Sequence, residues 1–307
     1  MPNFISVILP TYNPDAGRLN ATLQGLKAQT HDQKHWELII VNNNSSIGFE
    51  QGFNLEWHPM AKIINEPQAG LTYARLKGFG ASKGNLIVMV DDDNILDPAY
   101  LENVNHIFEK YERMGCAGGS SKPLFESPPP NWLIDFYESL ALRDFGEQIF
   151  IEEWANQYPA HAPIGAGMAI RKDALATYIH KNQSGPMILS DRQGSKLSSG
   201  GDNDMVLEIL KSGWQSGYFP QLTLQHIIPK ERMQVNYLAR LTYSSNISWV
   251  KVLDHHGINP WKKIDAMTLL PRNIKAWFKH KAWRGSVNYI KWKAACGLFK
   301  GLSTLKD

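Results

Sequence analysis

Short apolar runs separated by helical patterns organise the N-terminal third of the chain. Four runs are bounded by polar loops, Gly or Pro, and we expect each to form a strand. They cover residues 4–10, 36–41, 62–64 and 86–90. Leu19, Leu23 and Leu26 recur at helical spacing after the first strand, and a helix through Arg75 precedes the fourth. Strands and helices in this alternation predict parallel pairing through right-handed crossovers, and therefore a doubly wound α/β sheet.

Three carboxylates, Asp91, Asp92 and Asp93, follow the fourth strand. In an open α/β sheet, ligands bind just outside the carboxyl ends of the strands. Adjacent negative charges repel unless a cation lies among them, and Mg²⁺ or Mn²⁺ binds a few carboxylates together with substrate phosphates. On an extended segment Asp91 and Asp93 share one side, so we expect them to bind one ion while Asp92 points elsewhere. The alternative is that the acids favour a helix N-terminus, although Asp97 already supplies a cap and Pro98 a first helical residue.

The remaining elements are predicted from the same patterns. Helices are expected at 97–114, 132–142 and 202–211, and strands at 166–170 and 218–226. The segment 184–201 is rich in Ser and Gly, which predicts a mobile loop leading into the helix that begins at Asp202.

Charge divides the chain near residue 230. From Lys230 onward the sequence has 15 Lys/Arg and 4 Asp/Glu, although the net charge of the whole chain is only +3. Five of the ten tryptophans also lie in this part. We therefore expect a body at 1–229, followed by a helical, basic and tryptophan-rich region at 230–307.

Composition excludes several classes of protein. Two cysteines, Cys116 and Cys296, are too few for a disulfide framework and fit a reducing compartment. The first residues lack the basic region and cleavage pattern of a signal peptide, and no apolar run reaches the roughly 20 residues of a membrane-spanning helix. We expect a cytoplasmic protein, or one lying on the inner face of a membrane.

The basic region mixes aromatic and cationic side chains as interfacial helices do. The aromatic residues are Trp277, Phe278, Trp283 and Trp292, and an apolar stripe after Gly285 contains Val287, Ile290, Ala294 and Leu298. These patterns predict docking on an anionic membrane surface. The alternative is that the tryptophans pack against the catalytic domain.

Several common nucleotide- and metal-binding signatures are absent from the sequence. It contains no G-x-x-x-x-G-K-[ST], no H-E-x-x-H and no paired C-x-x-C. The glycines of 78–84 nearly match a dinucleotide-binding fingerprint, but they leave a helix and enter a strand, the reverse of what that motif requires. We interpret this segment as a turn.

Several motifs, taken in order, resemble family 2 glycosyltransferases with the GT-A fold. They are Val7–Asn13, Ile39–Ser45, Gly70–Arg75, Asp91–Asp93, Gly165–Arg171 and Gly200–Asp204. The resemblance extends over roughly residues 4–228 and is of the bacterial surface-polysaccharide type. It implies a GT-A-like, mostly parallel sheet, a nucleotide-sugar donor, a divalent metal and inversion at the anomeric carbon.

The same resemblance implies roles for individual residues. The donor-binding positions are Pro10, Thr11, Tyr12, Asn13, Asn42, Asn44, Arg75, Asp91 and Asp92. The metal-binding positions are Asp91, Asp93 and His226, and the acceptor-side positions are Trp132, Gly167 and Met168. Two alternatives stay open: Arg75 contacts a donor phosphate or lies on a helix surface, and His226 binds the metal or is structural.

The resemblance also implies the partners. A UDP-sugar is the expected donor, although family members often have Asp, which contacts the uridine base, where this chain has Asn42. The acceptor is expected to be a glycan or a lipid-linked glycan in bacterial surface polysaccharide or lipopolysaccharide synthesis, with no nucleic-acid partner. The body then divides into a nucleotide-sugar half at about 1–115 and an acceptor half at about 116–229.

Attack by an acceptor hydroxyl requires a carboxylate that takes up its proton. Asp202 and Asp204 both lie in the first turn of the helix at 202–211, but residues two apart point in nearly opposite directions. The apolar stripe through Met205 and Val206 faces the protein, and Asp202 lies over that side. We therefore assign the base to Asp202, with Asp204 as the second candidate. Capping of the helix is the alternative role for either acid.

Two other functions stay open. A sugar-nucleotide nucleotidyltransferase could share the sheet and the metal, but it would need a glycine-rich, basic loop where this chain has Thr11–Pro14. A non-catalytic nucleic-acid-binding protein could use the basic region. However, no known recognition module is visible in the sequence, and the tryptophans form no evident stacking platform.

Overall fold

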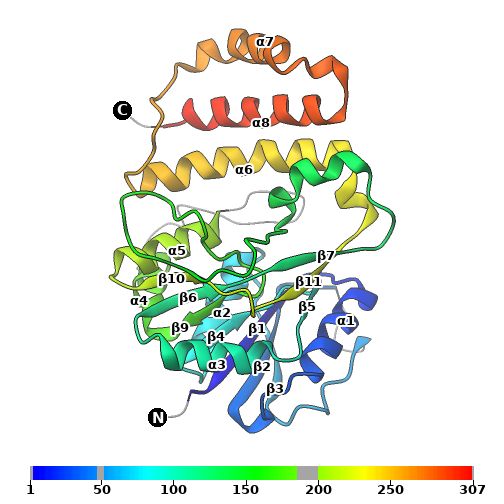
Figure 1. The fold of residues 1–307 in the computed structure, drawn as a ribbon, viewed down its shortest axis with the longest axis vertical. Helices are drawn as coiled ribbons and strands as arrows, with labels where there is room; N and C mark the ends of the chain where they lie inside the picture. Colours follow the sequence, from blue (N-terminus) through cyan, green and yellow to red (C-terminus); the bar gives the residue numbers. More distant parts are fainter. Residues whose placement is uncertain (1–2, 47–51, 185–199, 306–307) are drawn as a thin grey trace.

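The computed structural model describes residues 3–46, 52–184 and 200–305, which form an α/β body with a layer of helices over it (Figure 1). The body contains an eight-stranded sheet of order β3-β2-β1-β4-β9-β6-β10-β8. A three-stranded sheet of order β5-β11-β7 lies beside it. The predicted fold class, α/β with a large, mostly parallel sheet and a helical C-terminal region, is confirmed.

The first half of the large sheet is parallel and forms from the four predicted strands. These are β1 (Ile5–Thr11), β2 (Trp36–Asn42), β3 (Ala61–Asn65) and β4 (Leu86–Met89). The helices between them are α1 (Ala16–Lys27) and α2 (Leu71–Ala81). Thr11 pairs with Asn42, and Asn42 pairs with Asn65, so these strand ends form a row at one edge of the sheet.

Side chains of these strands alternate into two cores, one on each face of the sheet. On β1, Val7 and Leu9 pack with α1 and α3 (Tyr100–Lys110), whereas Ile8 packs on the other side with α2. All residues of β1 are buried, which explains its mostly apolar sequence. Burial on both faces holds the carboxyl end of β1 firmly in place.

The predicted helix at 97–114 is too long. Helix α3 ends at Lys110, and Met114–Gly118 form strand β6 instead. All five β6 residues are buried between β9 and β10, so sheet pairing outweighs the helical pattern there. Gly115 of this strand lies against Ile209 and Trp214, which leave no room for a side chain.

The second half of the large sheet mixes strand directions. Its other strands are β8 (Phe150–Glu152), β9 (Ala169–Arg171) and β10 (Gln215–Tyr218). The small sheet contains β5 (Asn94–Leu96), β7 (Ser121–Phe125) and β11 (Leu224–Ile228). The single strand predicted at 218–226 is therefore wrong, because a turn in which Leu222 N–H donates to Phe219 O separates β10 from β11.

One further predicted strand and two further predicted helices can be compared with the structure. The strand predicted at 166–170 begins only at Ala169, and the helix predicted at 132–142 is two short 3₁₀ helices. These span Asn131–Phe136 and Glu138–Leu140. The helix predicted at 202–211 is confirmed as α5 (Gly201–Lys211), and α4 (Ala176–Ser184) precedes it. Most of the loop predicted to be mobile at 184–201 lies outside the described residues.

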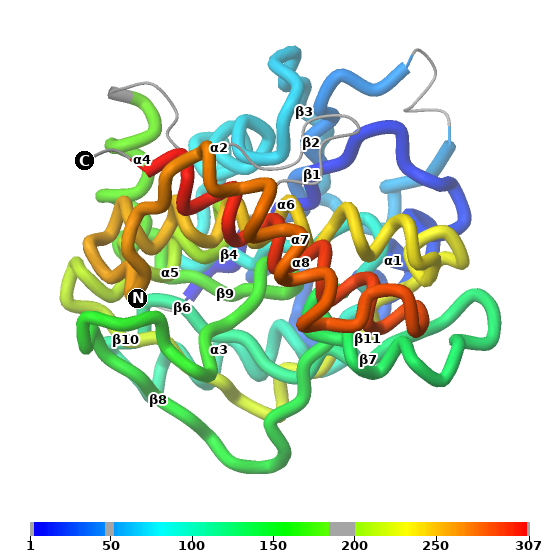
Figure 2. Tube along the Cα trace, turned by 90° about the horizontal axis from the view of Figure 1, so that it is seen from above, coloured from blue at the N-terminus to red at the C-terminus, as the bar shows by residue number. Residues whose placement is uncertain are grey.

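The C-terminal region consists of α6 (Val235–His255), α7 (Leu269–His280) and α8 (Ser286–Leu302). Helix α8 lies along α6, and α7 lies outermost, at the top of Figure 1 and in front in Figure 2. Ile290 of α8 is fully buried with Leu238 and Leu241 of α6, so the apolar stripe predicted after Gly285 packs against protein. Among the described helices, none combines the length and the apolarity needed to cross a membrane.

Candidate active site

A cavity of about 500 Å³ lies at the carboxyl ends of β1 and β4, between the sheet and α6. It brings together nine of the residues singled out from the sequence. These are Pro10, Thr11, Tyr12, Arg75, Asp91, Asp92, Asp93, Asp202 and His226. Arg232 and Leu241 also line the cavity, so the basic C-terminal region contributes to the site.

The three acids form a turn and not the extended segment expected from the sequence. Asn94 N–H donates to Asp91 O at 3.1 Å, and Asn94 Oδ1 accepts from Asp91 N–H at 3.2 Å. Because the chain turns here, Asp91, Asp92 and Asp93 all line the cavity. The expectation that Asp92 points elsewhere is therefore wrong.

Asp92 is joined to the end of β1. Thr11 Oγ1 donates to Asp92 Oδ2 at 2.5 Å. Burial, and next the charge of Asp93, raise the pKa of Asp92 to about 7, against the opposing effect of the Thr11 hydrogen bond. A cation near this carboxyl group would favour its ionised form and lower that pKa. Additional positive charge would therefore stabilise the acid turn, as we call Asp91–Asp93.

Asp93, His226 and Arg232 meet on one side of the cavity. Arg232 Nη1 lies 2.9 Å from Asp93 Oδ2 and 3.2 Å from His226 Nε2. His226 Nε2 lies 3.5 Å from Asp93 Oδ1. Because guanidinium only donates, Nε2 is the acceptor, and Nδ1 carries the imidazole hydrogen. This Nδ1 is buried and has no hydrogen-bond partner among the described residues.

Arg75 connects the acid turn to the start of α5. Its side chain is only 3% exposed, which excludes the alternative of a helix-surface arginine. Nη1 donates to Asp202 Oδ1, and Nη2 lies 3.8 Å from Asp91 Oδ1. The planar guanidinium fork therefore holds two carboxylates from different parts of the fold in one arrangement. The side chain of Asp202 stays 33% exposed within the cavity.

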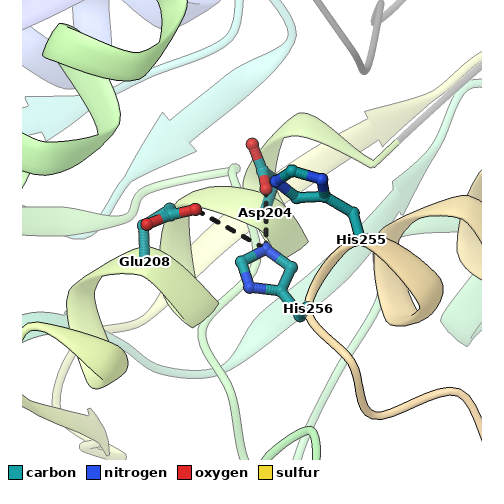
Figure 3. Close-up of side chains that lie close together, drawn as sticks. All are labelled: Asp204, Glu208, His255 and His256. Carbon is teal, nitrogen blue, oxygen red and sulfur yellow. Dashed lines mark hydrogen bonds and ion pairs between the residues drawn. The ribbon is translucent and has the colours of Figure 1, made fainter.

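Asp204 lies outside this cavity, in a group of side chains from α5 and the end of α6 (Figure 3). His256 Nε2 lies 2.7 Å from Asp204 Oδ1, and Lys181 Nζ lies 2.8 Å from the same oxygen. Burial opposes the ionisation of Asp204, but the hydrogen bonds from His256 and Lys181 outweigh it and hold its pKa below the usual range. Asp204 therefore has a fixed structural environment.

The same group has the composition of a metal site. Asp204, Glu208, His255 and His256 offer ligand atoms that all lie within 4.8 Å of one another. However, Lys181 Nζ pairs with Glu208 Oε1 at 2.8 Å as well as with Asp204, so an ammonium group already lies between the two carboxylates. We interpret the group as an ion-pair network that joins α5 to α4 and α6.

Three predicted donor residues are not among those that line the cavity. Asn42 Nδ2 donates to Asn65 Oδ1 at 2.9 Å, and Asn42 Oδ1 accepts from Ser45 N–H at 3.0 Å, so loop contacts use both ends of this amide. Asn13 and Asn44 adopt left-handed turn conformations, with φ of 45° and 63°. The neighbouring Asn43 lines the cavity instead.

The predicted acceptor-side residues are also displaced from the cavity. Gly167 O accepts from the Tyr100 hydroxyl at 2.5 Å, and Met168 is fully buried in the core behind the wall. Trp132 packs against Phe136, with ring centroids 6.1 Å apart, in the core beneath α6 and α8. Gly165 lines the cavity in place of these three residues.

Sequence reasoning did not assign roles to Gly165, Arg143 or Arg232, which all line the cavity. The Asp202 carboxylate packs against Gly165, where any side chain would collide with it. A glycine next to predicted strand residues indicates such a close approach, so Gly165 carried a usable signal. Arg232 lies in a 3₁₀ turn, Lys230–Met233, and Arg143 forms an isolated β-bridge with Ser121, and no local sequence pattern marks either arginine.

The donor atoms in the cavity fit a divalent cation. Asp91, Asp93 and His226 offer carboxylate oxygens and an imidazole nitrogen, which suit Mn²⁺ or Mg²⁺. The nitrogen of His226 that would bind the cation is Nε2, the atom that Arg232 now contacts, and the raised pKa of Asp92 shows that a cation would be favoured here. Arg232 is the group that an ion would displace from Asp93 and His226.

Comparison with known proteins identifies relatives. The model of the family described as "Glycosyl transferase family 2" matches residues 6–178. The chain is 23% identical over 179 residues to glucosyl-dolichyl phosphate glucuronosyltransferase of Haloferax volcanii. This match covers 56% of the chain and 53% of that protein, so the chain spans about half the length of this relative.

Two solved structures share the fold. One is mannosyltransferase PcManGT from Pyrobaculum calidifontis in complex with GDP-Man and Mn²⁺, with a TM-score of 0.61, 15% identity, and coverage of 100% of this chain and 89% of that chain. The other is S. aureus TarS 1-349 in complex with UDP, with a TM-score of 0.51, 12% identity, and coverage of 98% and 90%. At such identities the likeness concerns the fold alone. The family model, in contrast, covers more than half of the sequence, and the chain therefore belongs to glycosyl transferase family 2.

Proposed function

We propose that the chain is an inverting glycosyltransferase that moves a sugar from a nucleotide-diphosphate donor to an acceptor hydroxyl. The observation that carries the proposal is the pairing of Arg75 with both Asp91 and Asp202 in one cavity. Asp91 belongs to an acidic edge suited to a diphosphate and its cation. Asp202 is a partly exposed carboxylate suited to an acceptor hydroxyl.

At the donor end, departure of the nucleoside diphosphate builds negative charge. A bound Mg²⁺ or Mn²⁺ would stabilise that charge as a Lewis acid, and Asp91, Asp93 and His226 are the residues that would hold it. Arg75 orients the Asp91 carboxylate from a buried position. Thr11 holds Asp92 in the same way, so the acid turn is preorganised before the donor binds.

At the acceptor end, Asp202 takes the proton from the attacking hydroxyl. The hydroxyl approaches the anomeric carbon from the side opposite the diphosphate, which inverts its configuration. Arg75 fixes the position of Asp202 relative to the acid turn, and this supports Asp202 as the base. The second candidate, Asp204, is 4% exposed and already paired with Lys181 and His256.

For the donor we propose a UDP-sugar. TarS was solved with UDP and PcManGT with GDP-Man, so an assay of donors has to include both bases. Because Asn42 is used in loop contacts, the base would be contacted by other side chains at this end of the cavity, among which Asn43 and Tyr12 are present.

For the acceptor we propose a glycan or a lipid-linked glycan in bacterial surface polysaccharide or lipopolysaccharide synthesis. The Haloferax volcanii relative is named for glucosyl-dolichyl phosphate, a lipid-linked sugar. Such an acceptor fits a cytoplasmic protein that lies on the inner face of the cell membrane. We also propose a nucleotide-sugar half at about 1–115, an acceptor half at about 116–229, and a C-terminal region that completes the cavity through Arg232 and Leu241.

A panel of UDP- and GDP-sugars tests the proposed function. With Mn²⁺ or Mg²⁺ and a mixture of membrane glycolipid acceptors, one sugar class should release its nucleoside diphosphate, and EDTA should abolish the release. A well-folded protein that turns over no sugar nucleotide would overturn the proposal. Release of inorganic diphosphate from a nucleoside triphosphate and a sugar phosphate would indicate a nucleotidyltransferase instead.

A further inference from the structure

The outermost helix, α7, presents a row of large apolar side chains. Leu270, Ile274 and Phe278 repeat every four residues and are 70%, 50% and 63% exposed. Met267, one turn earlier, is 83% exposed, and the ring of Trp283 lies 5.8 Å from that of Phe278. Four-residue spacing puts these side chains on one side of the helix. Apolar residues gathered in this way on a surface mark a place where another surface binds.

A basic row borders the apolar row. Arg272, Lys275 and Lys279 are exposed and follow the next side of the same helix. Across residues 266–305 the sequence has eight Lys/Arg and no Asp/Glu. The partner that fits this face is therefore apolar at its centre and anionic at its border.

The opposite side of α7 is held by α8. Trp292 Nε1 donates to Asn273 O at 3.0 Å, and the rings of Trp277 and Trp292 meet edge to face with centroids 4.7 Å apart. Ala276, between them, is buried. The outer face is thus presented by a helix that is already folded and packed, so a partner need not order it on binding.

We propose that this outer face of α7, together with Trp283, docks on an anionic lipid bilayer. The apolar row enters the boundary between headgroups and acyl chains, and the basic row contacts anionic headgroups. This rests on the membrane association proposed above and names the surface that would produce it. That surface belongs to α7, because the stripe of α8 is covered by α6.

Two other occupants fit this face less well. Symmetric pairing of two copies through α7 would bring like charges together, with no acid in residues 266–305 to balance them. A nucleic acid would be bound through the basic row and would leave Leu270, Ile274 and Phe278 uncovered.

Co-sedimentation of the full chain with vesicles tests the apolar row. The protein should bind vesicles of phosphatidylcholine with about a third phosphatidylglycerol, and bind pure phosphatidylcholine much less. Leu270→Ser/Phe278→Ser should lower the bound fraction at least about fivefold. Leu124→Ser/Ile149→Ser removes side chains that are 40% and 46% exposed on the body and should bind like the wild type.

A second pair of variants tests the basic row. Lys275→Glu/Lys279→Glu should also lower binding at least about fivefold. Lys27→Glu/Lys77→Glu makes the same change of charge at exposed positions of α1 and α2 and should leave most of the binding intact. Donor and acceptor are absent from these assays, so failure of the surface would not be failure of glycosyl transfer.

Three outcomes would overturn the proposal. Equal loss of vesicle binding in the two α7 double variants and in their control variants would show that α7 has no special role. A lipid-independent dimer in sedimentation velocity, dissociated by Leu270→Ser/Phe278→Ser, would assign the face to a second copy. Loss of binding in the charge pair alone, with equally strong retention on DNA, would assign it to a polyanion.

Discussion

Arg232 Nη1 lies 2.9 Å from Asp93 Oδ2, the carboxylate on which a divalent cation would also depend. The same nitrogen lies 3.2 Å from His226 Nε2, so one guanidinium group pairs with two of the three proposed metal ligands. The chain itself therefore supplies positive charge to its acid turn. A cation must displace Arg232 before Asp93 and His226 can both bind it.

Arg232→Gln should tighten the binding of Mn²⁺ to the nucleotide-free protein by about tenfold, since the ion then has no competitor at Asp93. Isothermal titration calorimetry measures this affinity without any turnover. Arg143→Gln removes an equal charge from the same cavity, and Arg232→Lys keeps the charge but changes the geometry. Similar tightening in Arg143→Gln would mean that general electrostatics, not displacement, is responsible.

Arg75→Lys should lower kcat/KM for transfer at least about a hundredfold, because a single ammonium group cannot hold Asp91 and Asp202 together as the planar fork does. Steady-state kinetics with saturating acceptor measures the effect, and circular dichroism checks the fold. Lys77→Arg, an exposed change two residues further along α2, serves as the control and should keep normal rates. Wild-type kinetics in Arg75→Lys would show that the fork is dispensable.

Asp202→Asn should reduce transfer at least about a hundredfold, because the amide keeps the shape but cannot accept the proton. Metal-dependent binding of the donor should persist, since the acid turn is untouched. Initial rates and donor calorimetry together separate the two effects. If Asp202→Asn turns over normally while Asp204→Asn is inactive yet stably folded, the base is Asp204.

Asp204→Asn should instead destabilise the fold, by about 3–5 kcal/mol at pH 7, because Lys181 and His256 lose a shared buried partner. The folded pKa of Asp204 is lowered, so its contribution exists above the ordinary value of 3.8 and is lost as the pH falls through the folded pKa. Urea unfolding should therefore show a difference from wild type at pH 7 that shrinks as the pH falls below 3.8.

A surface pair provides the comparison for Asp204. Lys291 Nζ lies 2.8 Å from Asp135 Oδ2, with side chains 49% and 41% exposed. Asp135→Asn should lower the free energy of unfolding by less than about 1 kcal/mol at each pH of the urea experiment, as is usual for an exposed ion pair. A loss in Asp204→Asn no larger than this, or one independent of pH, would contradict the assigned ion-pair network.

Much of the parallel half of the fold could be predicted, because β1, β2 and β4 are buried on both faces and most of their residues are apolar. The second half of the large sheet was harder to predict from the sequence. The helix predicted at 97–114 ends at Lys110, and β6 (Met114–Gly118) was not predicted, since its pairing with β9 and β10 depends on residues more than 50 positions away along the chain. Short strands of this kind carry little local signal.

The residues of the candidate site likewise differ in whether the local sequence indicates them. Asp91, Asp93 and Asp202 were predictable because each stands at the end of a strand or the start of a helix, where ligands gather. Asn42 does not line the cavity, because contacts with Asn65 and Ser45 use both ends of its amide, and no sequence pattern indicates those contacts. Arg232 reaches the acid turn from the start of the C-terminal region, a long-range contact that no spacing in the sequence encodes.

Gly165 provides a test of how closely Asp202 must be placed. The Asp202 carboxylate lies directly against this glycine, and a methyl group there would overlap the carboxylate. Asp202 cannot simply move aside, because Arg75 holds it from the other side. Gly165→Ala should therefore displace the base and lower transfer at least about tenfold, since small misplacements at a reacting centre are costly.

The expected signature of Gly165→Ala is a loss of kcat with nearly unchanged metal-dependent donor affinity, because the atoms that a side chain at Gly165 would meet first belong to Asp202 and not to the acid turn. Gly80→Ala is the matched control: a side chain at Gly80 meets open space, and alanine within α2 should stabilise the fold by about 0.5–1 kcal/mol. Donor affinity is measured by calorimetry and transfer by initial rates. Normal transfer in Gly165→Ala would show that Asp202 tolerates displacement, which a general base held in one position by Arg75 should not.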